Sequence, residues 1–219
     1  MKSTKTVARC PWPTFDDPLY LAYHDEEWGV PVRDDRTIYE FLVLETFQAG
    51  LSWRTVLHKR AAFRRAFAAF KPKYVSRFGA RDVTRLLNDA GIIRNRRKIL
   101  AAINNANRFL DVQKDFGTFA DYMWSWVGHQ TLMHRFRGVK DYPPFIDEAV
   151  AWAKDLKARG FSFLGPTVVY AHMQAVGMVN DHIVSCFRYR LLAARSAGRK
   201  GGARRNGGVG GRGARRTSS

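Results

Sequence analysis

Cysteine is scarce in this chain of 219 residues, which contains only Cys10 and Cys186. A fold held by several disulfides is therefore excluded, and metal ligation is the better use of the pair. Long apolar runs are also missing, since the best candidate, 168–179, is interrupted by His172 and Gln174. We therefore expect no membrane-spanning helix, and because no apolar stretch precedes Cys10 we expect a cytoplasmic protein without a secretory signal.

Acidic residues are few relative to basic ones, with 19 Asp and Glu against 37 Lys and Arg, a net charge of +18 and a pI near 10.5. A charge of this sign favours a polyanionic partner, nucleic acid first and an anionic membrane surface second. Residues 195–219 contain eight of the cations, eight glycines and no acid. We expect a disordered N-terminus over 1–8, a folded domain over 9–194 and a disordered basic tail over 195–219.

Strand-like alternation is absent, and the apolar pattern is helical nearly throughout. We expect a monomeric all-α domain of eight to ten helices. Asp34 and Asp35 are positioned to cap a helix running from about Thr37 to Ala49. Further helices are expected in the stretch "AAFRRAFAAF", ending before Lys71-Pro72, in "FADYMWSWVG", and over 146–159, 168–178 and 181–192.

Residues 81–110 resemble two helices joined by a tight turn, with Gly91 at the expected C-terminal cap of the first. The second helix begins among Arg94, Arg96, Arg97 and Lys98. Cations there oppose the helix dipole, so helix stability does not explain them, whereas a bound phosphate does. The alternative is an ordinary solvated basic face. The glycine turn favours a helix-hairpin-helix contact with DNA.

Four zinc-type side chains occur at opposite ends of the folded domain. His182 and Cys186 in "NDHIVSC" are four residues apart, which places them on one face if the segment is helical. Cys10 and His24 complete a Cys₂His₂ set suited to tetrahedral zinc. Four protein ligands leave no position for water, so such a zinc is structural. The alternative is a satisfied core histidine with inert buried thiols.

Glu45 interrupts the apolar stretch "TIYEFLVLETFQAGLSW". A buried acid is costly unless something hydrogen-bonds it, so Glu45 either pairs with a buried arginine or faces a pocket. Tyr23 and Trp53 are candidates for the walls of that pocket. Aromatic faces with one buried acid suit a flat cationic ligand.

Other enzyme patterns are absent from the sequence, including GxSxG, a Walker loop and HExxH. We identify no partners for the remaining histidines, which are His58, His129, His134 and His172. We assign no role to Asp111, which follows the two-helix stretch 81–110 in the sequence. No lysine is evident as a nucleophile that would form a Schiff base.

Several blocks together resemble the 3-methyladenine DNA glycosylase I family, in the same order and over roughly Arg9 to Arg190. They are "CPW", "DPLYLAYHDEEWGVP", "LETFQAGLSWRTVLHKR", "NDAGIIRNRRKI" and "QAVGMVNDHIVSC". The resemblance implies an all-α helix-hairpin-helix glycosylase fold whose N- and C-terminal segments are joined by one structural zinc. It also implies base flipping and excision of 3-methyladenine from alkylated double-stranded DNA, without strand cleavage.

The resemblance also assigns roles to particular positions. The implied zinc ligands are Cys10, His24, His182 and Cys186; the implied base pocket is Glu45, Tyr23, Trp12 and Trp53, with Glu45 and Tyr23 as the catalytic pair. The implied DNA contacts are Gly50 and Leu51 as a wedge and Gly91, Ile93, Arg94, Arg96, Arg97 and Lys98 in the hairpin.

Two other functions are weighed against this one. The first is a non-catalytic member that recognises damage without excision, against which the presence of Glu45, Tyr23 and Trp53 argues. The second is an RNA-associated protein, suggested by the Gly/Arg-rich tail.

Overall fold

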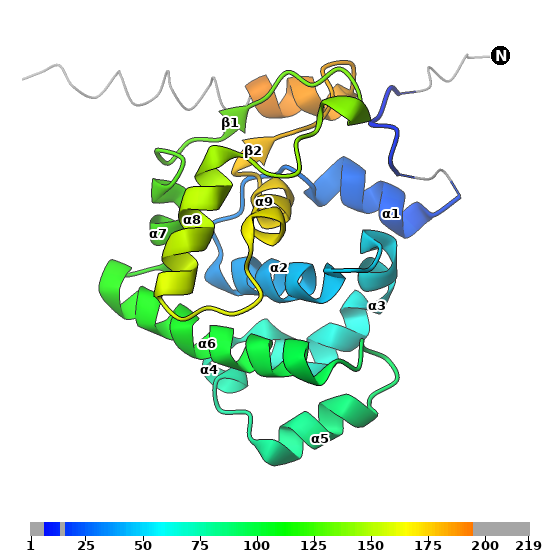
Figure 1. Ribbon diagram of the computed structural model, residues 1–219. Coiled ribbons are helices and arrows are strands. Elements are labelled where there is room, and N and C mark those ends of the chain that lie inside the picture. The colour runs from blue at the N-terminus through cyan, green and yellow to red at the C-terminus, as the bar shows by residue number, and fades with distance from the viewer. Residues whose placement is uncertain (1–6, 14–15, 195–219) are drawn as a thin grey trace, which may run out of the picture.

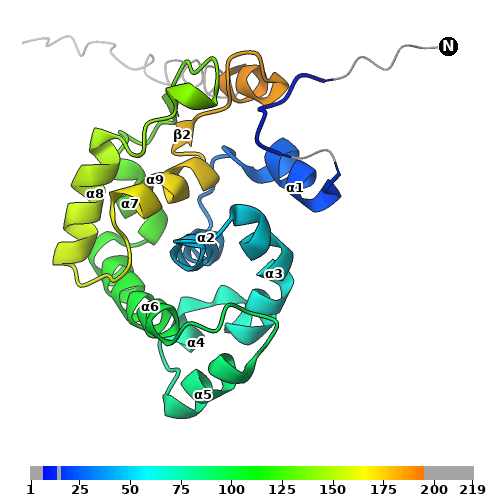
Figure 2. The same cartoon turned by 45° about the vertical axis from the view of Figure 1, so that its right-hand side comes forward.

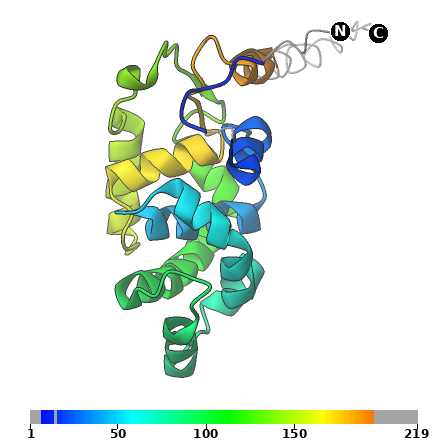
Figure 3. The ribbon, with the colours of Figure 1, turned by 90° about the vertical axis from the view of Figure 1, so that its right-hand side faces the viewer.

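The computed structural model describes residues 7–13 and 16–194. Most of the predicted disordered segment 1–8 and all of 195–219 lie outside these ranges. Ala8 is described, and its carbonyl accepts the backbone N–H of Phe187 at 2.9 Å. The first described residues therefore lie beside the last helix, residues 187–194, as the dark blue and orange ribbons of Figures 1 and 3 show.

One helix, α2 (Asp35–Gln48), forms the centre of the fold. Figure 2 shows it nearly end-on, surrounded by other helices. Every residue from Ile38 to Phe47 is buried, so this helix is buried on all sides rather than along one apolar stripe. The carboxylate of Asp34 caps it by accepting the N–H of Thr37 at 2.9 Å, as the sequence predicts. Glu40 and Glu45 are consequently buried within the core.

The remaining elements wrap around α2 (Figure 1), and the prediction of a helical fold is confirmed. In chain order they are α1 (Pro18–Ala22), the π-helical turn Tyr23–Glu27, α3 (Trp53–Ala66), the 3₁₀ turn Ala68–Phe70, α4 (Pro72–Val75), α5 (Ala80–Asn88), α6 (Arg96–Phe116), α7 (Phe119–Ser125), β1 (Leu132–Met133), the 3₁₀ turn Val139–Asp141, α8 (Asp147–Ala158), α9 (Pro166–Ala175) and β2 (Val179–Asn180).

The two short strands, β1 and β2, pair in parallel, with Leu132 opposite Val179 and Met133 opposite Asn180. This bridge is too short to give a sequence signal. Among the described helices, none is long and apolar enough to cross a membrane.

Two predicted helices have different bounds in the structure. The helix expected through "AAFRRAFAAF" stops at Ala66, because Ala68, Ala69 and Phe70 adopt positive φ values and turn the chain sharply. This turn stacks the buried rings of Phe67 and Phe70 at 6.0 Å. The helix expected over 181–192 does not begin until residue 187.

Candidate functional site

Four buried side chains from both ends of the described chain converge on one point. The ligand atoms of Cys10, His24, His182 and Cys186 all lie within 4.8 Å of one another. The Cys186 Sγ is 3.5 Å from His182 Nδ1 and 3.6 Å from His24 Nε2. The Cys10 Sγ is also 3.5 Å from His182 Nδ1. This group is able to hold a metal ion.

Hydrogen bonds orient both imidazole rings toward the shared point. The Nδ1 of His24 is 2.7 Å from a carboxylate oxygen of Asp25, which in turn accepts from Arg9. The Nε2 of His182 is 3.0 Å from the carbonyl oxygen of Trp28. In each ring the nitrogen that faces an oxygen is held by that contact, so the opposite nitrogen is the one directed at the shared point, where a metal ligand would be needed.

The reason that His182 and Cys186 meet differs from the one predicted. Residues 182–186 are not helical, and the N–H of Cys186 donates to the carbonyl of Ile183 in a turn. The helix begins only at residue 187. On the N-terminal side, the π-helical turn brings the neighbouring residues Tyr23 and His24 into the interior together, both buried.

Beside this cluster lies a second group, composed of aromatic rings. The Tyr23 ring lies 5.2 Å from the Trp53 ring and 6.5 Å from the Trp12 ring, measured between centroids. Trp12 also packs edge-on against His24 at 5.0 Å. The structure thus brings the three predicted aromatic residues of the base pocket together, next to the predicted metal ligands.

Glu45 is buried close enough to Tyr23 for its charge to act on the phenol, and it lacks the arginine that one interpretation required. Its Oε2 has no hydrogen-bond partner within the described part of the chain, and neither has the indole Nε1 of Trp53. Burial raises the pKa of Glu45 to about 8. Burial first, and then the charge of Glu45, raise the pKa of the Tyr23 phenol well above its usual value. Two unsatisfied polar atoms and a protonated phenol therefore mark this group.

Glu40 provides the contrast, because it is the acid on α2 that pairs with arginine. One of its carboxylate oxygens accepts from Arg60, and Arg64 Nη2 lies 2.8 Å from the same oxygen. Arg60 also binds Glu27 at 2.7 Å. Two buried acids thus have opposite surroundings on one helix.

The predicted wedge lies between α2 and α3. Gly50 has a φ of +84° with open space where a Cβ would be, and the side chain of the next residue, Leu51, is exposed. Ser52 then caps α3, its Oγ accepting the N–H of Thr55 at 3.2 Å. An apolar side chain is therefore held at the surface by a tight turn.

The predicted hairpin consists of α5, residues 89–95 and α6. Its cations Arg94, Arg96 and Arg97 are exposed, and none forms an ion pair with a described acid. Ile93 is partly buried against the core. Asn95 caps α6 by accepting the N–H of Lys98 at 3.2 Å.

Two hairpin residues have positions that the sequence did not predict. The Lys98 ammonium is buried and donates to the carbonyls of Phe47 and Ala49, so it caps α2 and does not face a phosphate. Gly91 is not a helix cap with positive φ, because α5 ends at Asn88. A Cβ at Gly91 would lie 3.0 Å from the Cβ of Ala62, so glycine permits close approach to α3.

An ion-pair group that the sequence did not reveal joins α1 to α3, with the carboxylate of Asp17 buried and its two partners about half exposed. Asp17 caps α1, and its carboxylate lies 2.6 Å from Arg54 Nε and 2.7 Å from His58 Nε2. A bond to His58 lowers the pKa of Asp17 to about 2. Because α1 leads into Tyr23 and α3 begins at Trp53, this group fixes two walls of the aromatic group. The only signal was a cap-type residue before Pro18.

Two more histidines have surroundings that the sequence did not reveal. His134 Nδ1 lies 2.6 Å from the buried carboxylate of Asp181. His172 is buried with neither ring nitrogen hydrogen-bonded to a described residue, and burial lowers its pKa to about 3. Both lie outside the aromatic group.

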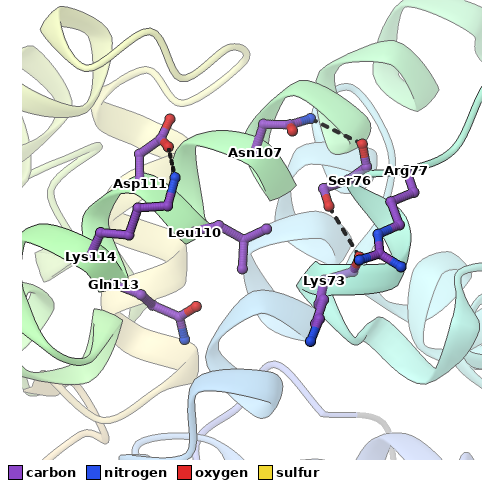
Figure 4. A pocket seen from close by; sticks show the side chains of 8 residues that line it. All are labelled: Lys73, Ser76, Arg77, Asn107, Leu110, Asp111, Gln113 and Lys114. Atoms are coloured by element: carbon purple, nitrogen blue, oxygen red, sulfur yellow. Dashed lines mark hydrogen bonds and ion pairs between the residues drawn. The ribbon is translucent and has the colours of Figure 1, made fainter.

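Asp111 is not part of the aromatic group or of the metal-type cluster. It lines a surface pocket of about 460 Å³ between α4 and α6, together with Lys73, Arg77 and Lys114. Figure 4 shows it paired with Lys114, at 3.0 Å. An exposed, ion-paired carboxylate has no raised pKa to offer a reaction, which agrees with leaving Asp111 out of the site.

Comparison with known proteins gives one consistent result. The chain is 46% identical over 183 residues to DNA-3-methyladenine glycosylase 1 of Escherichia coli, covering 84% of this chain and 97% of that protein. Its fold is similar to a crystal structure of 3-methyladenine DNA glycosylase I, with a TM-score of 0.80, 47% identity, and coverage of 82% and 98%. It is also similar to the Staphylococcus aureus enzyme solved to explain 3-methyladenine recognition, with a TM-score of 0.79, 36% identity, and coverage of 82% and 95%.

The model of the protein family described as methyladenine glycosylase matches residues 12–189 of this chain. That span includes α2 with Glu45, the aromatic group and three of the four clustered ligands. The chain therefore belongs to the methyladenine glycosylase family.

Proposed function

We propose that this protein removes 3-methyladenine from alkylated double-stranded DNA by hydrolysing the N-glycosidic bond, without cutting the strand. The observation that carries the proposal is the buried Glu45 carboxylate, whose Oε2 has no partner among the described residues. An unpaired buried acceptor costs stability, and such a cost is typical of a site that a ligand completes. The relatives named for action on 3-methyladenine support this function.

The chemistry of the lesion matches these side chains. Methylation at N3 gives the adenine a positive charge and weakens its bond to the sugar before any protein acts. Glu45 accepts the N–H edge of the base, while Tyr23, Trp12 and Trp53 contact its faces. The protein has mainly to extrude the nucleotide, hold the charged base and leave room for water at the sugar.

The pKa of Glu45 explains why a cation is preferred. Since burial raises this pKa to about 8, the carboxyl group is mostly protonated in the empty site at neutral pH. A cationic base supplies both an opposite charge and N–H donors, and both favour the ionised carboxylate. Ordinary adenine is neutral and has a stronger glycosidic bond, so it is a poorer substrate on both counts.

Extrusion of the base requires contacts outside the pocket. The exposed Leu51, on the turn at Gly50, is the proposed wedge that fills the space left by the flipped nucleotide. Arg94, Arg96 and Arg97 are the proposed phosphate contacts of a helix-hairpin-helix, with Gly91 and Ile93 forming its turn. Lys98 has no part in this contact, because its ammonium is bound to α2.

A structural zinc at Cys10, His24, His182 and Cys186 is part of the proposal. With Zn–S near 2.3 Å and Zn–N near 2.0 Å, a tetrahedral ion separates S and N ligands by about 3.5 Å. The sulfur to nitrogen distances of 3.5 and 3.6 Å meet this requirement. Zinc would hold the N-terminal segment to the turn before the last helix. We expect the protein to be a monomer in the cytoplasm, where the two thiols stay reduced.

The test is product analysis on methylated duplex DNA incubated with the purified protein. Release of 3-methyladenine, detected by chromatography, with strands that break only after alkali, is the expected result. Unmethylated DNA in the same reaction should release no adenine. Strand breaks before alkali would contradict the monofunctional assignment, and tight binding of methylated DNA without base release would instead indicate a non-catalytic damage-binding protein.

A further inference from the structure

One exposed aromatic residue lies next to the hairpin in a conformation that its type rarely adopts. Phe163, between α8 and α9, has a φ of +61° and is 38% exposed. For a residue with a Cβ this left-handed conformation is energetically costly. Burial of the ring does not explain that cost, since much of the ring remains in solvent.

Hydrogen bonds from α6 hold the preceding residues in place. Asn105 is fully buried, and its side-chain amide accepts the N–H of Ser162 at 2.8 Å and donates to the Ser162 carbonyl at 2.9 Å. Asn104 donates to the carbonyl of Gly160 at 2.8 Å. These bonds fix the backbone on the N-terminal side of Phe163, so the ring is presented to the surface by a rigid segment.

The Phe163 ring faces the hairpin. The guanidinium carbon of Arg97, in the first turn of α6, lies 5.5 Å from the ring centroid, within the range of a cation–π contact. No described acid pairs with Arg97, so its charge remains available.

The charged side chains that line the groove beside the ring have one sign. Phe163 lines a groove of about 490 Å³ along α8, where Lys154 and Lys157 also line the wall and no acidic side chain does. Asp155, which is on the same helix, is already bound by Arg159 at 2.7 Å. Two lysines thus share a groove with the aromatic ring on which Arg97 rests, and this combination is complementary to a nucleic-acid backbone.

We infer that Phe163 is a positioning residue for DNA binding, which holds the Arg97 guanidinium for contact with a phosphate beside the hairpin. A guanidinium resting on a ring loses less side-chain entropy when it binds than a free one. The inference rests on the proposed function, since it assigns the segment between α8 and α9 to the same DNA-binding surface.

The test compares duplex DNA binding by wild type and by Phe163→Gly, measured by fluorescence anisotropy over a range of salt concentrations. Glycine adopts positive φ freely, so the variant keeps its backbone, which circular dichroism and a thermal melt verify. Loss of one phosphate contact predicts about five- to tenfold weaker binding near 0.1 M salt, and a slope of log K against log salt smaller by about one. Arg97→Ala should give the same change, and the double variant should bind no more weakly than either single one.

Phe116→Ala is the matched control. Arg159 also rests on the Phe116 ring, at 4.9 Å, but it is paired with Asp155 and Asp115 at the other end of α6. Unchanged DNA affinity is expected there. The inference is overturned if Phe163→Gly binds DNA as wild type does, keeps the wild-type salt slope, or adds its full loss to that of Arg97→Ala. These measurements use unmethylated DNA, so a failure of 3-methyladenine release would refute the proposed function separately.

Discussion

At the scale of single residues, α2 carries two buried glutamates with different surroundings. Glu40 is bound by Arg60 and Arg64, whereas Glu45 has an unpaired oxygen beside Tyr23. The sequence showed that Glu45 interrupts an apolar stretch, but not which glutamate had an arginine partner. That partner comes from α3, and contacts between helices are not encoded in the spacing of either one.

The unpaired carboxylate predicts an unusual pH dependence of stability. The pKa of Glu45 is raised from 4.5 to about 8 by folding, so the folded state binds more protons than the unfolded state between these values. Stability from this group is therefore full below pH 4.5 and is lost as the pH rises to 8. Glu45→Gln should remove this pH-dependent loss. At pH 8 its free energy of unfolding should therefore exceed that of wild type by on the order of a few kcal/mol. Denaturant titrations of both proteins at pH 5 and pH 8 measure this difference.

Glu40→Gln is the matched control for that experiment. Removing its charge leaves Arg60, which is largely buried, without a full partner, so this variant should be less stable than wild type at both pH values. If Glu45→Gln were destabilised in the same way, Glu45 would be part of a structural ion pair.

At the scale of elements, sequence patterns located most helices but not their connections. Asp34 correctly predicted the start of α2, since a cap acts within three residues. The convergence of His182 and Cys186 was predicted for the wrong reason, because a turn rather than a helix joins them. Lys98 was assigned to DNA, yet it binds carbonyls at the end of α2. Such errors arise where a neighbouring element determines the position of a side chain.

The ion pairs between α1 and α3 give a prediction about substrate binding. Asp17→Asn keeps an oxygen to cap α1 but loses the charge that binds Arg54 and His58. The aromatic walls should lose their alignment, so base release from methylated DNA should slow about tenfold, an effect of one charged hydrogen bond. Since the pKa of Asp17 is lowered to about 2, wild type should lose this contribution only as the pH falls from about 4 to 2.

Asp34→Asn, at the exposed cap of α2, is the appropriate control for Asp17→Asn, and its base release should match wild type. Equal rates for Asp17→Asn and wild type would show that α1 and α3 are aligned by packing alone.

The turn between α9 and β2 predicts a strict requirement for glycine. Gly177 has a φ of +73°, and a Cβ there would lie 2.4 Å from the backbone carbon of Val30. Gly177→Ala should therefore lose at least about 2 kcal/mol of unfolding free energy through clash and strain. Gly128→Ala, with a φ of +59° and open space around it, should lose less. Thermal melts of the two variants compare these effects, and an equal loss in both would contradict the close approach.

At the scale of the whole molecule, the four proposed metal ligands join parts of the chain that are distant in sequence. Cys10 and His182 are 172 residues apart, so a metal bound to both restricts the unfolded chain over most of its length. The types and the number of these residues predicted the site from the sequence, whereas the distances between them are known only from the folded structure. The excess of basic residues predicted a polyanionic partner, but only the structure separates Lys98 from the exposed arginines.

Loss of the proposed zinc should therefore lower the stability of the fold while leaving base release possible. Zinc analysis of purified protein should give one ion per chain, and Cys186→Ala should abolish it and lower the melting temperature. At a temperature where this variant is still folded, base release should persist at a reduced rate, since the proposed reaction uses Glu45 and not the metal. Complete loss of activity in a folded, metal-free protein would contradict a purely structural role.

The central claim is that the unpaired Glu45 carboxylate receives the damaged base. Its most direct test is the single-turnover rate of 3-methyladenine release from methylated duplex DNA by wild type and Glu45→Gln, with melting curves of the same preparations. Loss of a charged hydrogen bond predicts a rate about 10- to 100-fold lower in a variant at least as stable as wild type. A stable Glu45→Gln protein that releases 3-methyladenine at the wild-type rate would contradict the account.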